Sequence, residues 1–164
     1  MSDFVMEEGY SYYSTSTDSV TRKYDGNTLQ SYTGHQNDVS VPAGVKQLGF
    51  KCFFDNKDIR QVRLPNGLID IYDKAFMRCE NLEVIEIPSS VEWIGVKAFW
   101  GCSSLKTVVI YSNKVSIGPS CFDWCTSLET MYFASPLVFD KTKEQLRMAA
   151  DYGIFPRNVQ IKFL

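Results

Sequence analysis

The sequence predicts an α/β solenoid, in which one short unit repeats and stacks into a single continuous core. Two observations support this prediction. Apolar and small residues return to the same columns every 23 residues, and within each unit a period typical of a strand alternates with one typical of a short helical turn. The columns hold Phe53, Phe76, Phe99, Phe122; Cys52, Ala75, Ala98, Cys121; Leu48, Ile71, Ile94, Ile117; and Ile59, Leu82, Leu105, Leu128.

Each unit contains one main strand, in which apolar residues alternate or nearly alternate with others, as expected when one face is buried. Proline follows three of these segments and ends the strand, because it lacks a backbone N–H. After the strand comes a brief second strand and then apolar residues spaced for a short helix or 3₁₀ turn. The main strands are predicted at Val39–Val41, Val62–Leu64, Ile85–Ile87, Val108–Ile110 and Met131–Phe133.

The composition is that of a globular protein, with 45% hydrophobic and 22% charged residues in 164. The net charge of −2 and the absence of a basic run argue against nucleic acid as a partner, and no stretch is apolar enough for membrane insertion. The N-terminus lacks the features of a secretory signal. We therefore expect a cytoplasmic protein as the sequence stands, or a surface or secreted one if the chain is a trimmed form.

The segment from Cys121 to Cys125 resembles a metal or redox site, but the repeat accounts for it. Cys79, Cys102 and Cys125 share one column, and Cys52 and Cys121 occupy a column that holds alanine in the other units. We expect all five to pack as small buried hydrophobes with free thiols. No metal, cofactor or catalytic residue is predicted, because the single histidine, His35, lies in a polar turn and no phosphate-binding motif is present.

The unit from Leu82 to Leu105, with the pattern Leu-x-x-Ile-x-Ile-Pro-x-x-Val-x-x-Ile-Gly-x-x-Ala-Phe-x-x-Cys-x-x-Leu, closely resembles the BspA-like, or Treponema-type, leucine-rich repeat. The resemblance covers residues 39–134. It implies a right-handed, curved solenoid with a parallel sheet on the concave face and short helical turns opposite. It also implies a role in protein binding, which in exported members often means cell adhesion.

The segments outside the repeats are predicted to be caps, which cover the exposed ends of the core. Residues 1–38 form the N-terminal cap, with a hairpin over Tyr24–Tyr32 that turns at Asp25-Gly26. Residues 135–164 form the C-terminal cap, with a helix from Asp140 to about Tyr152 and a strand over Val159–Phe163. Caps and repeats together make one structural domain.

Residues that point outward from the strands are not dictated by the core, so they are where we expect the binding site. The concave face becomes apolar and aromatic towards the C-terminus, a composition enriched in binding hot spots. We predict a protein ligand, with contact between these residues and the C-terminal cap as the alternative. The predicted partner-binding residues are Arg63, Glu86, Val109, Tyr111, Thr130 and Tyr132.

A secondary aromatic surface is predicted at Trp93, Trp100 and Trp124, positions where the repeat does not require bulk. These side chains are expected either to bind a partner or to pad the convex side. Self-association through such residues, or through an incompletely capped end, is the alternative function. The two functions differ in the oligomeric state that they predict.

Overall fold

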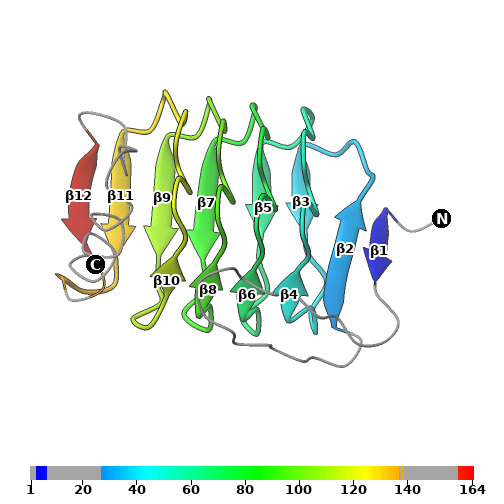
Figure 1. Ribbon diagram of the computed structural model, residues 1–164, viewed down its shortest axis with the longest axis horizontal. Helices are drawn as coiled ribbons and strands as arrows, with labels where there is room; N and C mark the ends of the chain where they lie inside the picture. Colours follow the sequence, from blue (N-terminus) through cyan, green and yellow to red (C-terminus); the bar gives the residue numbers. More distant parts are fainter. Residues whose placement is uncertain (1–2, 7–26, 137, 139–158) are drawn as a thin grey trace.

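The computed structural model describes residues 3–6, 27–136, 138 and 159–164 and confirms the predicted solenoid. Each turn of the chain adds one strand to each of two sheets, which we call sheet I and sheet II (Figure 1). Strands of neighbouring turns pair at the predicted interval, so that Val62 lies opposite Ile85 and Ile85 opposite Val108. The period in the sequence is therefore the register between adjacent rungs of the solenoid.

Sheet I is entirely parallel, in the order β12-β11-β9-β7-β5-β3. Buried and outward residues alternate along its strands, so one face packs on the core and the other is open. The predicted final strand is confirmed as β12 beside β11. The strands are β3 (Asp38–Ser40), β5 (Gln61–Arg63), β7 (Val84–Ile87), β9 (Thr107–Ile110), β11 (Thr130–Phe133) and β12 (Gln160–Phe163).

Sheet II has the order β1-β2-β4-β6-β8-β10, with β1 antiparallel to β2 and the remaining pairs parallel. β2 lies between β1 and β4, while the predicted Asp25-Gly26 turn lies outside the described residues. The strands are β1 (Phe4–Met6), β2 (Thr28–Tyr32), β4 (Gln47–Leu48), β6 (Asp70–Ile71), β8 (Trp93–Ile94) and β10 (Ser116–Ile117).

The core between the sheets is a set of stacked columns, as predicted. The rings of Phe53, Phe76, Phe99 and Phe122 are buried and stack with centroid distances of 4.8, 5.0 and 5.4 Å, each pair only 5° from parallel. Tyr32 extends the column at the N-terminal end, 5.2 Å from Phe53. The ring spacing is close to the strand spacing, because the backbone ladder places one ring on each rung.

The segments that connect sheet II to sheet I form what we call the turn side: residues 49–58, 72–81, 95–104 and 118–127. The predicted short helical turns are not confirmed here. Cys52 donates its N–H to Gly49 of its own rung, but Phe53 donates to Ala75 of the next rung at 2.7 Å. The left-handed backbone at Lys51 and Asp55, with φ of 58° and 59°, breaks any helix. The turn side is therefore a ladder of stacked turns.

The fold consequently has almost no helix and is better described as a β-solenoid than as α/β. Within the described residues only Pro136 and Val138 are helical, and the predicted cap helix from Asp140 to Tyr152 lies outside them. No helix in the described part of the chain is long and apolar enough to cross a membrane.

Candidate functional site

The outer face of sheet I is formed by the residues that alternation predicted to point outward. Val62 and Ile85 are buried in the core, whereas Arg63 and Glu86, the next residues along their strands, are exposed. Further along the face, Glu86 pairs in register with Val109, and Val109 with Tyr132. These side chains project from paired strands, so the backbone holds them at fixed positions before any partner arrives.

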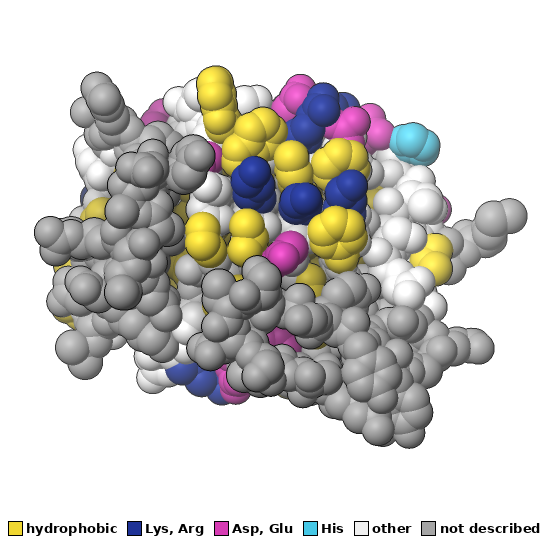
Figure 2. All heavy atoms as spheres, viewed as in Figure 1, with side chains coloured by type: hydrophobic (Ala, Val, Ile, Leu, Met, Phe, Trp, Pro, Cys, Tyr) yellow, Lys and Arg dark blue, Asp and Glu magenta, His cyan; other side chains and the backbone are white. Residues whose placement is uncertain are grey.

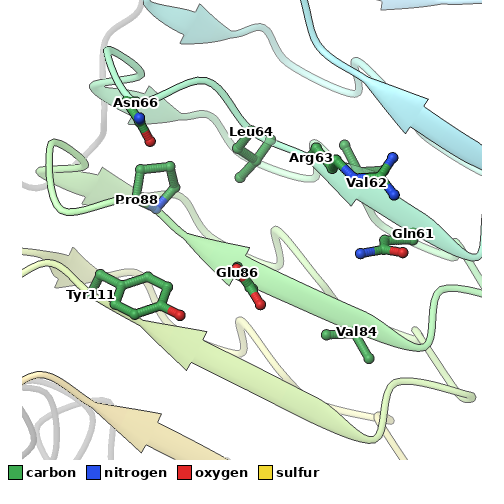
Figure 3. Close-up of a pocket in the computed structure, with 9 residues that line it drawn as sticks. All are labelled: Gln61, Val62, Arg63, Leu64, Asn66, Val84, Glu86, Pro88 and Tyr111. Atoms are coloured by element: carbon green, nitrogen blue, oxygen red, sulfur yellow. The ribbon is translucent and has the colours of Figure 1, made fainter. Parts of the chain in front are cut away.

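A hollow of about 230 Å³ lies on this face, over β5, β7 and the residue that follows β9 (Figure 3). Three of the six predicted partner-binding residues line it: Arg63, Glu86 and Tyr111. Tyr111 is 44% exposed, which is high for so large an aromatic side chain. The complete lining is Gln61, Val62, Arg63, Leu64, Asn66, Val84, Glu86, Pro88 and Tyr111.

The two charged residues of the hollow differ from several other surface charges in having no ion-pair partner among the described residues. Within the described residues, neither Arg63 nor Glu86 forms an ion pair, although they occupy adjacent rungs. Elsewhere the pairs are close: Lys57 lies 2.6 Å from Glu80, Arg60 lies 3.0 Å from Glu83, and Lys114 lies 2.7 Å from Glu92. As far as the described residues go, the hollow therefore offers a cation and an anion that are not engaged in ion pairs.

The remaining predicted residues lie on the same face but outside the hollow. Val109, Thr130 and Tyr132 are half-buried, and the Tyr132 ring is covered by Lys162 of β12, whose Nζ lies 5.7 Å from the ring centroid. The alternative interpretation, contact with the C-terminal cap, therefore applies to Tyr132. Tyr111 has no such cover from β12.

The structure divides the three predicted tryptophans between two surfaces. Trp93 is half-buried in β8 of sheet II, and its indole N–H is buried without a hydrogen-bond partner. Trp100 and Trp124 lie on the turn side with ring centroids 6.3 Å apart, and Trp124 is 68% exposed. A single aromatic surface made of all three does not form.

The cysteines are packing residues, as predicted: all five are buried and free. Cys79, Cys102 and Cys125 donate their S–H groups to the carbonyl oxygens of Phe53, Phe76 and Phe99 on the preceding rung, at 3.0 to 3.2 Å. Burial raises the pKa of Cys79 to about 12, so its thiol stays protonated and weakly nucleophilic at neutral pH. Within the described residues no cluster of His, Cys, Asp and Glu is arranged to hold a metal ion.

Two further polar groups were considered as sites. In sheet II, Gln47 Nε2 donates to Asp70 Oδ2 at 3.1 Å and to the Tyr72 hydroxyl at 2.7 Å, and Thr28 Oγ1 donates to Gln47 Oε1 at 2.8 Å. Gln47 and Asp70 are fully buried, so the network satisfies core polar atoms and is closed to a partner. His35 lies 2.6 Å from Asp58 and is almost fully exposed, a surface contact.

Sequence reasoning missed two features of the surface. Leu64 and Asn66 contribute to the hollow from the turn after β5, beyond the part where alternation applies. Lys51, Lys74 and Lys97 form a row on the turn side, which the 23-residue register contains as a column of identical residues. The column itself was the signal that could have revealed it.

The fold is shared with bacterial leucine-rich repeat proteins of known structure. A leucine-rich repeat protein from Eubacterium ventriosum superposes with a TM-score of 0.61 at 19% identity, over 96% of this chain and 40% of that one. One from Bacteroides capillosus gives 0.60 at 23% identity, over 81% and 99%. A leucine rich cell surface protein from Faecalibacterium prausnitzii gives 0.55 at 19% identity, over 82% and 42%. At these identities the likeness concerns the fold alone.

This chain thus spans 40% of the length of the Eubacterium protein. No curated protein matches the sequence. The family described as "BspA type Leucine rich repeat region" does match, with six copies over residues 26–142, a range that includes the predicted repeats and reaches beyond them at both ends. Because this match covers most of the 164 residues, the chain belongs to the BspA-type leucine-rich repeat family.

Proposed function

We propose that the protein is a non-catalytic binding module that recognises a protein partner through the outer face of sheet I. The observation that carries the proposal is the hollow, which is lined by the exposed ring of Tyr111 and by Arg63 and Glu86, two charges without an ion pair among the described residues. Aromatic residues and arginine are enriched where binding energy is concentrated. The predicted strip of Val109, Thr130 and Tyr132 would extend the contact towards the C-terminus.

The chemistry of the hollow specifies its partner in outline. A carboxylate of the partner would pair with Arg63, a basic group with Glu86, and an apolar side chain would fill the space between Val84 and Tyr111. Arg63 lies in β5 and Glu86 in β7, while Tyr111 follows β9, so little backbone freedom would be lost on binding.

The family supports a role in binding rather than catalysis, because leucine-rich repeat proteins typically bind proteins and are in general not enzymes. The Faecalibacterium neighbour is described as a cell surface protein. We extend that setting to this chain as part of the proposal, with adhesion as the form that protein binding would take there.

The test is affinity capture with three versions of the protein, followed by identification of the bound proteins. We expect the Tyr111→Ala/Tyr132→Ala variant to lose the main partner and the Arg63→Glu/Glu86→Arg variant to weaken its capture. The matched control, Phe50→Ala/Phe54→Ala, removes two exposed aromatic rings from the turn side and should capture the partner as the wild type does. Undiminished capture by Tyr111→Ala/Tyr132→Ala would refute the site.

One observation favours self-assembly as a second candidate. Among the described strands β12 pairs only with β11, and the exposed Leu164 follows it. An edge strand is a template for pairing with another chain. Sedimentation at several protein concentrations separates the candidates, since a strict monomer removes self-assembly and leaves the binding proposal intact.

A further inference from the structure

A row of lysines runs along the turn side, on the surface that faces the reader in Figure 2. Lys51, Lys74 and Lys97 lie on three successive rungs; we call them the lysine row. Backbone bonds between rungs hold it in place: the lysine N–H groups donate to the carbonyl oxygens of Asp73, Val96 and Pro119 at 3.3, 3.0 and 3.1 Å. The three side chains therefore start at intervals of about 4.8 Å, the spacing of adjacent strands.

The lysine row is not explained by the fold. Each lysine has left-handed backbone, with φ of 58°, 60° and 56°, a conformation that favours glycine or asparagine. None of the three forms an ion pair within the described residues, in contrast to Lys57, Lys106 and Lys114. Three like charges on neighbouring rungs repel one another, and no carboxylate of the described residues pairs with them.

Hydrophobic side chains border the row on both sides (Figure 2), and some of them are aromatic. Lys51 Nζ lies 4.8 Å from the centroid of the Phe54 ring and 5.3 Å from that of Phe50, and Lys74 Nζ lies 5.5 Å from Phe50. Both rings remain partly exposed. Beyond them, Trp124 packs against Trp100 and is the most exposed large apolar side chain of the described residues. The cations thus form a central row that is bordered by partly exposed aromatic rings.

We propose that the lysine row and its aromatic borders bind a linear acidic polysaccharide with one carboxylate on each sugar ring. Carboxylates that project from one side of such a chain would pair with the ammonium groups of the row. The C–H faces of the sugar rings would stack on Phe50, Phe54 and Trp124. This surface is separate from the hollow on sheet I, so a protein and a glycan would bind at different places.

The order of charges and rings favours a polysaccharide over a membrane. A surface that inserts into a bilayer carries its apolar side chains at the centre and its cations at the rim, where they reach the headgroups. Here the cations form the centre and the rings the border.

Nucleic acid and acidic peptides fit less well. Three cations on a protein of net charge −2 are few for a chain that carries a phosphate at every nucleotide. A row of identical cations at one fixed interval matches a polymer whose charges also repeat at a fixed interval, which an acidic peptide of mixed sequence does not provide.

The experiment measures binding of polygalacturonate to the full chain by calorimetry and by tryptophan fluorescence, because Trp100 and Trp124 lie at the border of the row. Dextran serves as the uncharged polysaccharide and polyglutamate as the polyanion without sugar rings. The variant Lys51→Gln/Lys74→Gln/Lys97→Gln removes the three charges and keeps most of each stem. Arg60→Gln/Lys106→Gln/Lys114→Gln removes the same charge from ion-paired positions.

We expect polygalacturonate to bind in preference to dextran and polyglutamate, and the variant of the lysine row to lose at least tenfold in affinity. The control variant should stay within about twofold of the wild type. Failure of the wild type to bind polygalacturonate, an equal loss in both variants, or equal binding of polyglutamate would overturn the proposal. So would binding to phosphatidylglycerol vesicles or single-stranded DNA without binding to polygalacturonate. Unchanged circular dichroism confirms that each variant is folded.

Discussion

Inside the solenoid the same residue type returns at every rung, whereas along the outer column of sheet I that contains Arg63 the residue changes at every rung. The interior column repeats phenylalanine four times, each ring stacked on the next. The outer column that passes through Arg63 continues with Glu86, Val109 and Tyr132, although both columns follow the same backbone ladder. The difference shows that the ladder determines spacing, and burial determines identity.

The reason is that an interior position has the same surroundings on every rung. A phenylalanine ring that packs well between two rungs also packs well between the next two, so the same residue type is suitable at every rung. An outer position is exposed to water, so packing does not constrain its side chain. Contact with a partner can constrain it. The lysine row is a surface column that repeats as the interior does, and for this reason we propose a ligand that repeats too.

The largest expected change in the free energy of unfolding comes from a substitution in the interior phenylalanine column. Phe99 is fully buried between Phe76 and Phe122, so truncation to alanine leaves a cavity and removes two ring contacts. We expect Phe99→Ala to lower the free energy of unfolding by about 3–5 kcal/mol. Urea denaturation followed by circular dichroism measures it.

The control for this prediction is a phenylalanine of the surface. Phe54 is 37% exposed, and its main contact is the ammonium group of Lys51. Phe54→Ala should cost about 1 kcal/mol or less. Equal losses in the two variants would contradict the distinction between interior and surface columns.

The fold could be predicted because its signal lies in the interior columns. Phe53, Phe76 and Phe99 recur at one interval, and that interval is the register of the sheets. The helical turns could not be rejected in this way, since apolar spacing on the turn side suits a helix and a stack of turns equally. The bond from Phe53 to Ala75 of the next rung decides between them, and it is non-local.

The candidate site, like the fold, could be predicted only in part from the sequence. Alternation placed Arg63 and Glu86 on the outer face, because it requires only the direction of each side chain. The hollow depends on how the residues after the strands pack, and the cover of Tyr132 depends on a strand distant in sequence. The lysine row could have been predicted from the register alone, because Lys51, Lys74 and Lys97 occupy one column of the 23-residue repeat.

A second prediction concerns the pH dependence of the interior. Burial raises the pKa of Cys79 from its ordinary value of 9.0 to about 12, so the unfolded thiol ionises first. Its contribution to stability is complete below pH 9 and is lost as the pH rises from about 9 to about 12. The loss approaches roughly 1.4 kcal/mol per pH unit for one thiol.

The measurement is the free energy of unfolding across this range for the wild type and for Cys79→Ala. We expect a shallower decline in the variant, because one group fewer takes part. Lysine and tyrosine residues titrate in both proteins and cancel in the difference. Parallel curves would mean that the Cys79 thiol is no more protected in the folded state than in the unfolded chain.

The smallest expected change in the free energy of unfolding is at Trp124, which lies on the surface and is not part of an interior column. Its backbone is left-handed, with φ of 63°, and the equivalent residue one rung earlier is Gly101, with φ of 73°. Trp124→Gly relieves about 1–2 kcal/mol of backbone strain in the folded state. Two effects act in the opposite direction, each by about 0.5–1 kcal/mol: the contact with Trp100 is lost, and the unfolded chain gains conformational freedom.

These terms nearly cancel, so the free energy of unfolding of Trp124→Gly should stay within about 1 kcal/mol of the wild type. If Trp124 instead belonged to the packing of the solenoid, the loss would approach that of Phe99→Ala. The same variant should bind polygalacturonate more weakly, because an exposed ring face is gone. A residue that contributes little to folding and measurably to binding is what distinguishes the surface of this repeat from its interior.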